Sequence, residues 1–124
     1  MSVVTGEGYA VGSLDDLGEG YGFRKVRAEL GVTAFGVNAV VLPAGSTSRR
    51  HYHEEQQELY FVHEGTIDIL FGDGTEHGLE PGSFARVDAH TVRALRNSGQ
   101  GDAVYVCVGG KDGYVGRDGK PADD

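Results

Sequence analysis

Hydrophobic and polar residues alternate along most of this chain in short runs, a pattern typical of strands that bury one face. In residues 58–62, for example, Glu58, Tyr60 and Val62 share one face of an extended segment. Helical periodicity is weak throughout. The expected strands cover residues 21–30, 33–42, 58–62, 66–71, 83–87, 91–97 and 103–110. Many short strands separated by turns predict an all-β sandwich or barrel.

Glycine-containing turns separate these strands. Residues 63–65, His-Glu-Gly, are expected to join two strands as a hairpin. Residues 71–75 predict a second tight turn, with Gly72 and Gly74 supplying positive φ. The Pro-Gly pair ending at Gly82 predicts the turn into the following strand.

The length of 124 residues fits a single domain with a useful core. We expect one β-barrel domain over residues 1–110. Residues 111–124 are polar and rich in glycine, so we expect a loose C-terminal tail there.

Charge and cysteine content narrow the function classes. The net charge of −8 should repel nucleic acid and anionic membranes, and no basic patch offsets it. No segment has the ~20 apolar residues of a membrane span. A single cysteine, Cys107, excludes an intrachain disulfide and favours a reduced, cytoplasmic setting, where it is a small buried hydrophobe.

The chemistry that stands out is a group of two histidines and a carboxylate. His51 and His53 are separated by one residue, so in an extended segment both imidazoles emerge on the same face. Glu58 follows after a polar linker too short for a helix. Two imidazoles and a carboxylate suit a divalent transition metal, as in the facial triad of non-haem iron oxygenases. A metal site is therefore the first hypothesis.

These residues belong to a longer run that resembles the first motif of the cupin superfamily. The run has Gly45, His51, His53, Glu58 and Gly65 at the motif's spacing. The resemblance implies an antiparallel double-sheet β-barrel of the jelly-roll type, with His51, His53 and Glu58 binding Fe, Mn, Ni or Zn. It also implies a homodimer, for which residues 3–11 are the candidate segment. Open sheet edges, which are usually paired or covered, favour the same expectation.

The second cupin motif is degenerate. Its spacing survives from Gly82 to Asn97, but Arg93 stands where the family has its fourth, histidine ligand. Arginine has donors only, so it cannot bind the metal. Three roles are open for Arg93: an ion pair with Glu58, a fork for an anionic ligand, or a rim residue that reaches solvent. His90, in the preceding turn, is either a substitute ligand or a solvent-facing histidine.

If Glu58 points into the barrel, Tyr60 on the same strand face does so too, and if Arg93 points inward, so does Asn97. Apolar walls with a few polar groups suit a small molecule, so Arg93, Tyr60 and Asn97 are the expected substrate-binding residues, the ligand being anionic if Arg93 binds it. Three function classes remain open. They are a metal-dependent enzyme such as the family's dioxygenases, isomerases or decarboxylases, a non-catalytic binding or sensor protein, and a barrel that acts through its dimer interface.

Overall fold

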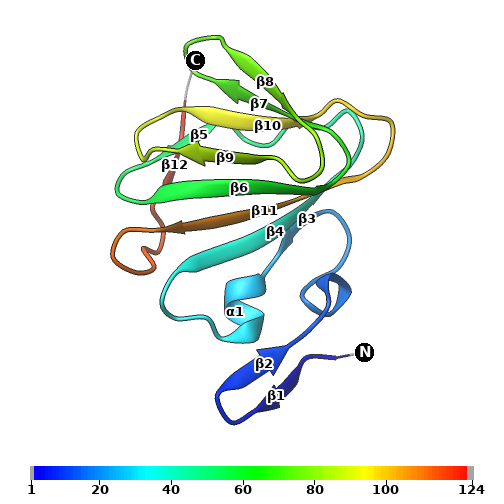
Figure 1. Ribbon diagram of the computed structural model, residues 1–124. Coiled ribbons are helices and arrows are strands. Elements are labelled where there is room, and N and C mark those ends of the chain that lie inside the picture. Colours follow the sequence, from blue (N-terminus) through cyan, green and yellow to red (C-terminus); the bar gives the residue numbers. More distant parts are fainter. Residues whose placement is uncertain (1, 123–124) are drawn as a thin grey trace.

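The computed structural model describes residues 2–122 and confirms the all-β jelly-roll architecture, with two five-stranded antiparallel sheets and a separate two-stranded sheet (Figure 1). Residues 1 and 123–124, the outer ends of the expected domain and tail, lie outside the described residues. Two short helices, η1 (Leu14–Asp16) and α1 (Val26–Leu30), lie in the N-terminal part of the chain. Neither of them has the length and apolar character that would let it cross a membrane.

The two large sheets divide the strands as follows. The first sheet has the order β12-β5-β10-β7-β8, and the second has the order β3-β4-β11-β6-β9. The strands of the first sheet are β5 (His51–His53), β7 (Ile67–Phe71), β8 (Glu76–Leu79), β10 (Arg93–Asn97) and β12 (Gly119–Pro121). Those of the second sheet are β3 (Gly22–Arg24), β4 (Gly36–Leu42), β6 (Gln57–Glu64), β9 (Phe84–Val87) and β11 (Ala103–Gly110).

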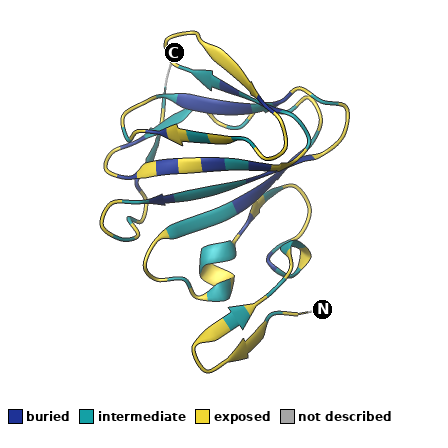
Figure 2. Ribbon diagram, in the orientation of Figure 1, coloured by how far each residue is buried: buried dark blue, intermediate teal, exposed yellow. Residues whose placement is uncertain are grey.

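The hydrophobic core contains alternating residues from both sheets. On β6 the predicted alternation is confirmed, since Glu58, Tyr60 and Val62 are buried whereas Leu59 is exposed. Figure 2 shows the same banding along this strand. Each fully buried aliphatic side chain stabilises the fold by about 1.5–3 kcal/mol. The core residues are Val40, Leu42, Tyr60, Val62, Ile67, Ile69, Leu79, Val87, Leu95, Ala103 and Tyr105.

The strand expected over residues 21–30 is wrong in its second half. Only β3 is extended. Helix α1 follows it and ends at Leu30, and the capping residue Gly31 has a left-handed φ of 72°. Residues 27–30, Arg-Ala-Glu-Leu, are good helix formers, and their preference prevails over the alternation of charged and apolar positions. A five-residue helix is too short for its period to be recognised in the sequence.

The hairpin expected at residues 63–65 is also wrong, because β6 and β7 belong to different sheets. The chain turns a corner there. Gly65 has a φ of 79°, and a Cβ at this position would lie 2.8 Å from that of Ala103. A glycine between two apolar strands gives the same sequence signal whether the chain pairs with itself or crosses to the opposite sheet.

The turn expected at residues 71–75 is present and joins β7 to β8 as an antiparallel hairpin. Gly74 has the positive φ that was expected, at 90°. Gly72 has none. Its Cβ would lie 3.0 Å from the Cβ of Val92, so close packing accounts for the absence of a side chain.

The N-terminal segment forms a hairpin of β1 (Val4–Gly6) and β2 (Tyr9–Val11), and within residues 2–122 these two strands pair only with each other. The hairpin projects away from the large sheets (Figure 1) and is mostly exposed (Figure 2). The next segment is better anchored. The buried guanidinium of Arg24 donates to the carbonyls of Leu14, Gly18 and Gly20.

The loose tail expected after Gly110 is wrong over residues 118–121. Strand β12 pairs antiparallel with β5, with Gly119 opposite His53 and Pro121 opposite His51. Asp118, immediately before β12, is only 5% exposed. The C-terminal segment therefore lies directly beside the two histidines.

Candidate metal centre

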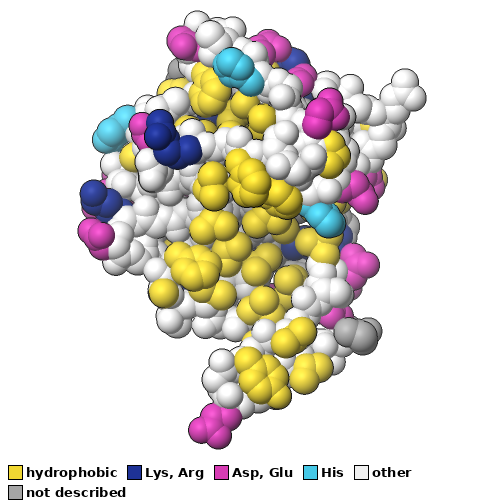
Figure 3. All heavy atoms as spheres, viewed as in Figure 1, with side chains coloured by type: hydrophobic (Ala, Val, Ile, Leu, Met, Phe, Trp, Pro, Cys, Tyr) yellow, Lys and Arg dark blue, Asp and Glu magenta, His cyan; other side chains and the backbone are white. Residues whose placement is uncertain are grey.

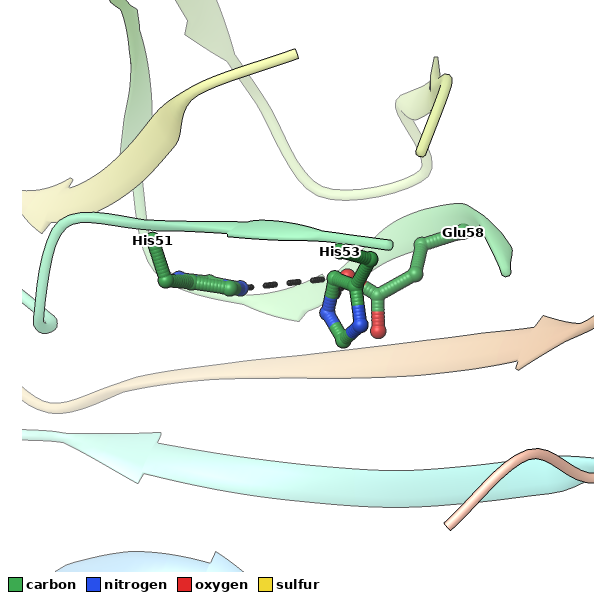
Figure 4. Close-up of side chains that lie close together, drawn as sticks. All are labelled: His51, His53 and Glu58. Carbon is green, nitrogen blue, oxygen red and sulfur yellow. Dashed lines mark ion pairs between the residues drawn. The ribbon is translucent and has the colours of Figure 1, made fainter. Parts of the chain in front are cut away.

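His51, His53 and Glu58 converge from two sheets onto one point (Figure 4). The histidines lie on β5 of the first sheet and Glu58 on β6 of the second. One ligand atom from each residue lies within 4.8 Å of the others. The structure therefore brings together the three residues that the sequence singled out.

The geometry of the group is compact and open on one side. His53 Nε2 lies 3.1 Å from Glu58 Oε1, and His51 Nε2 lies 3.9 Å from the same oxygen. The two rings meet edge to face, with centroids 5.2 Å apart. The side chain of His51 is 19% exposed, against 9% for His53 and 10% for Glu58, so solvent reaches the group from the side of His51.

Two glycines leave room for these side chains. Gly109 pairs with Glu58 in the second sheet, and a Cβ there would lie 3.2 Å from Glu58 Cγ. Gly119 pairs with His53 in the first sheet, and a Cβ there would lie 3.3 Å from His53 Cε1. Any larger residue at either position would press on a candidate ligand.

Arg93 lies on β10 opposite His51, and its side chain is completely buried. Its Nη2 donates to Glu58 Oε1 at 2.7 Å. Its Nη1 donates to the Thr91 carbonyl at 2.7 Å, and its Nε donates to the Tyr60 hydroxyl at 3.2 Å. Of the roles left open for Arg93, the structure shows the ion pair with Glu58 and excludes the solvent-reaching rim residue.

Glu58 is an ionised carboxylate in this environment. The Tyr60 hydroxyl donates to Oε1 at 2.6 Å, so one oxygen faces Tyr60, Arg93 and His53 together. Burial alone would raise the pKa of Glu58, but the neighbouring imidazoles of His51 and His53 and the hydrogen bond from the Tyr60 hydroxyl outweigh it and hold the pKa well below its usual range. The carboxylate is therefore available as a ligand at any moderate pH.

The other predicted site residues lie elsewhere. Asn97 is buried on β10, where its amide nitrogen donates to the carbonyls of Leu42 and Gly101 and its oxygen accepts from the backbone of Gly99. These bonds tie the loop after β10 to β4, and a contact between Asn97 and a ligand stays a prediction. His90 is exposed in the turn before β10, as expected of a solvent-facing histidine.

Cys107 lies on β11 opposite Tyr60 and packs against the core. Burial and the nearby Glu58 carboxylate raise the pKa of its thiol well above the ordinary value. The thiol therefore stays protonated at neutral pH, which argues against a nucleophilic role.

Sequence reasoning missed Asp118. This residue accepts hydrogen bonds from the backbone N–H groups of Glu55 and Gln56, and its Oδ2 lies 3.4 Å from His53 Nδ1. Gln56 approaches the same ring nitrogen, with its amide Nε2 at 3.1 Å. Nothing in the local sequence marks Asp118, because it lies in a polar, glycine-rich stretch far along the chain from His53.

The donor set fits a divalent transition metal in type and spacing. Two imidazole nitrogens and a carboxylate oxygen are the ligands of the facial triad, which leaves further positions open. The contacts of Glu58 Oε1 to Arg93 and Tyr60 would have to rearrange, or the other carboxylate oxygen would have to serve. The residues therefore fit a metal held by three ligands, in competition with Arg93.

Comparison with known families gives one match over most of the chain. A family model described as Cupin domain matches residues 38–109, which run from within β4 to within β11 and include all three candidate ligands.

Individual relatives resemble parts of the chain. It is 39% identical to quercetin 2,3-dioxygenase of Bacillus subtilis over 54 residues, which are 44% of this chain and 16% of the dioxygenase. It superposes on a sugar phosphate isomerase of the cupin superfamily from Silicibacter pomeroyi with a TM-score of 0.65 and 29% identity, over 85% of this chain and 60% of the isomerase. This chain therefore spans less than two thirds of either protein.

The fold is also found in a small protein of similar size. An uncharacterised double-stranded β-helix protein from Klebsiella pneumoniae superposes with a TM-score of 0.74 and 18% identity, covering 92% of this chain and 97% of that protein. This likeness concerns the fold alone.

Proposed function

This chain belongs to the cupin family, and on that basis we propose that it binds a divalent transition metal through His51, His53 and Glu58 and a small organic molecule beside it. The observation that carries the proposal is the convergence of three ligand atoms within 4.8 Å, on a side that solvent can reach. The low pKa of Glu58 also supports metal binding, because a metal binds the carboxylate form.

The chemistry in question is that of a metal with open coordination positions. Fe, Mn, Ni and Zn all accept imidazole and carboxylate ligands. Once bound, such a metal would act as a Lewis acid on a substrate oxygen. The relatives named above include a dioxygenase and an isomerase, so a metal-dependent reaction of one of these two types is the activity that we propose.

Arg93 limits how that substrate can bind. We expect Arg93, Tyr60 and Asn97 to line the ligand, but the guanidinium is already engaged by Glu58, Tyr60 and Thr91. An anionic ligand would have to displace one of these contacts. Metal binding alone does not require the Nη1 and Nε contacts of Arg93 to be displaced.

The ion pair itself supports a second candidate function, a non-catalytic binding or sensor protein without metal. A positive guanidinium 2.7 Å from Glu58 neutralises the carboxylate in the manner of a metal ion. In that case Arg93 replaces the metal structurally, and an organic ligand binds without one.

Metal titration separates the two candidates. Protein purified without an affinity tag and stripped with a chelator is titrated with Zn(II), Ni(II), Mn(II) and, without oxygen, Fe(II). One equivalent of at least one metal, lost in His53→Ala and retained in His77→Ala, is the expected result, since His77 is exposed on β8 away from the group. Binding that is substoichiometric for every metal would exclude the first candidate and leave the second.

The assembly that we propose is a cytoplasmic homodimer. Exposed large hydrophobic residues within residues 2–122 all lie outside the first sheet, on the hairpin or on and beside the second sheet. Figure 3 shows these apolar surfaces on one side of the molecule. A two-stranded hairpin is marginally stable alone. In a dimer with a two-fold axis, the hairpin of each copy would pack on the second sheet of the other and cover its apolar surface.

A further inference from the structure

The two ring nitrogens of His53 face different carboxylates. Nε2 lies 3.1 Å from Glu58 Oε1, and Nδ1 lies 3.4 Å from Asp118 Oδ2. A neutral imidazole carries one N–H, so the ring can donate to one of the two carboxylates at a time. The choice decides whether His53 can bind a metal.

Only one of the two tautomers leaves a lone pair for the metal. If the proton is on Nε2, the ring donates to Glu58 and the nitrogen that faces His51 and Glu58 is blocked. If the proton is on Nδ1, the ring donates toward Asp118 and Nε2 is free. A carboxylate only accepts hydrogen bonds, so Asp118 favours the second form and Glu58 the first.

Gln56 does not decide between them. As placed, its amide Nε2 lies 3.1 Å from His53 Nδ1, while its Oε1 is buried and has no hydrogen-bond partner among the described residues. A half-turn of the amide exchanges the positions of its nitrogen and oxygen. The Gln56 amide can therefore donate to an unprotonated His53 Nδ1 or accept from a protonated one.

Asp118 is held so that it cannot turn away. Both of its oxygens accept from the backbone N–H of Glu55, at 3.0 and 3.1 Å, and Oδ2 also accepts from that of Gln56 at 2.8 Å. It is 5% exposed, and β12 fixes it beside β5. Its orientation is set by the backbone, independently of the histidine.

Building on the proposed metal function, we infer that Asp118 is a positioning residue that selects the Nδ1–H form of His53 and so presents Nε2 to a metal. Residues that hold a ligand histidine in this way typically change metal affinity by 10–100-fold when they are replaced. The substitution to test is Asp118→Asn, because the remaining oxygen can still accept from the backbone of Glu55 and Gln56 while the charge is lost. Asp73→Asn is the matched control, since Asp73 accepts a backbone N–H from Thr75 within its own exposed turn between β7 and β8.

The primary measurement is long-range ¹H–¹⁵N NMR of the imidazole nitrogens in metal-free protein. We expect Asp118→Asn to shift His53 toward the Nε2–H form and Asp73→Asn to leave it unchanged. The second measurement is Zn(II) affinity by chelator competition, where Asp118→Asn should bind about 10–100-fold more weakly. A purely structural role for Asp118 would not move the tautomer. Asp118→Ser, which also keeps one oxygen for the backbone, serves if the asparagine variant does not fold.

The outcomes separate this inference from the proposed function. An unchanged His53 tautomer in Asp118→Asn overturns the inference even if the wild type binds Zn(II). A shifted tautomer in a protein that binds no metal supports the positioning role of Asp118 and overturns the metal function. A shifted tautomer together with weaker Zn(II) binding supports both.

Discussion

Arg93 Nη2 donates a hydrogen bond of 2.7 Å to Glu58 Oε1. Arg93 lies on β10 at the position where the second cupin motif has a histidine. The substitution exchanges a neutral ligand for a fixed positive charge next to the carboxylate. Burial lowers the pKa of Arg93, but its contacts with Tyr60 and Glu58 outweigh burial and raise it, so the guanidinium remains charged. A metal at this site would therefore compete with Arg93 for a carboxylate that is already neutralised.

Arg93→His should tighten metal binding. The change removes the competing cation and restores a fourth ligand, an imidazole nitrogen, beside His51. We expect Zn(II) to bind at least about tenfold more tightly, equivalent to about 1.4 kcal/mol, in chelator competition. Arg96→His is the matched control, because Arg96 lies on the same strand but pairs with Asp68 and Glu76 on the other face. Equal or weaker binding in Arg93→His would contradict the proposed position of the guanidinium at the metal site.

Arg93→Met should destabilise the metal-free protein strongly. It would leave Glu58 buried without its cation, and breaking a buried ion pair costs about 3–5 kcal/mol. Urea denaturation in the presence of a chelator measures the free energy of unfolding. The double variant Glu58→Gln with Arg93→Met should recover part of the loss, since neither charge is then left alone. A loss no larger than that of Arg96→Met, expected at about 1 kcal/mol or less for a surface pair, would argue against this pairing energy.

The stability of the metal-free protein should fall on the acid side of pH 5 in part through Glu58. Its folded pKa lies well below the ordinary value, so the stabilisation is complete above the unfolded pKa of about 4.3 and is lost as the pH falls below it. The free energy of unfolding, measured by urea denaturation from pH 7 to pH 3, should depend less steeply on pH in Glu58→Gln. Asp118 contributes with the same sign, because backbone hydrogen bonds lower its pKa despite burial. Parallel curves for the wild type and Glu58→Gln would show that Glu58 has an ordinary pKa.

Removal of apolar side chains from the hairpin should dissociate the proposed dimer. Val4, Tyr9 and Val11 are 56%, 60% and 59% exposed, so their replacement by serine costs the folded monomer little. Light scattering after size-exclusion chromatography should give twice the chain mass for the wild type and the chain mass, 13.2 kDa, for the triple variant. Glu7→Gln, at the tip of the same hairpin, should remain dimeric. A wild-type protein of 13.2 kDa would refute the dimer outright.

The strand faces and the pairing of His51 with His53 could be predicted because they depend on short-range periodicity, whereas the jelly-roll architecture was expected from the resemblance to the cupin motif. The alternation of Glu58, Tyr60 and Val62 with exposed neighbours specifies a strand face, and the single residue between His51 and His53 puts both rings on one side. Turn glycines such as Gly74 mark a backbone conformation that other residues avoid. These signals are local, so one sequence is enough to recognise them.

The features that could not be predicted depend on which strands become neighbours. Gly65 marks a turn, but only the three-dimensional structure shows that the chain crosses there to the opposite sheet. Asp118 has the same difficulty, because its partners Glu55 and Gln56 are brought to it by the pairing of β12 with β5. A polar, glycine-rich segment resembles a disordered tail when that pairing is unknown.

The pairing of β12 with β5 also sets an order of assembly during synthesis. Asp118 and Glu55, which it holds, are 63 residues apart along the chain. The ribosome therefore releases His51, His53 and Glu58 well before the residue that orients His53 has been made. A nascent chain that lacks Asp118 holds the three candidate ligands without the carboxylate beside His53, so under the proposed metal function its affinity for metal should rise when β12 pairs with β5.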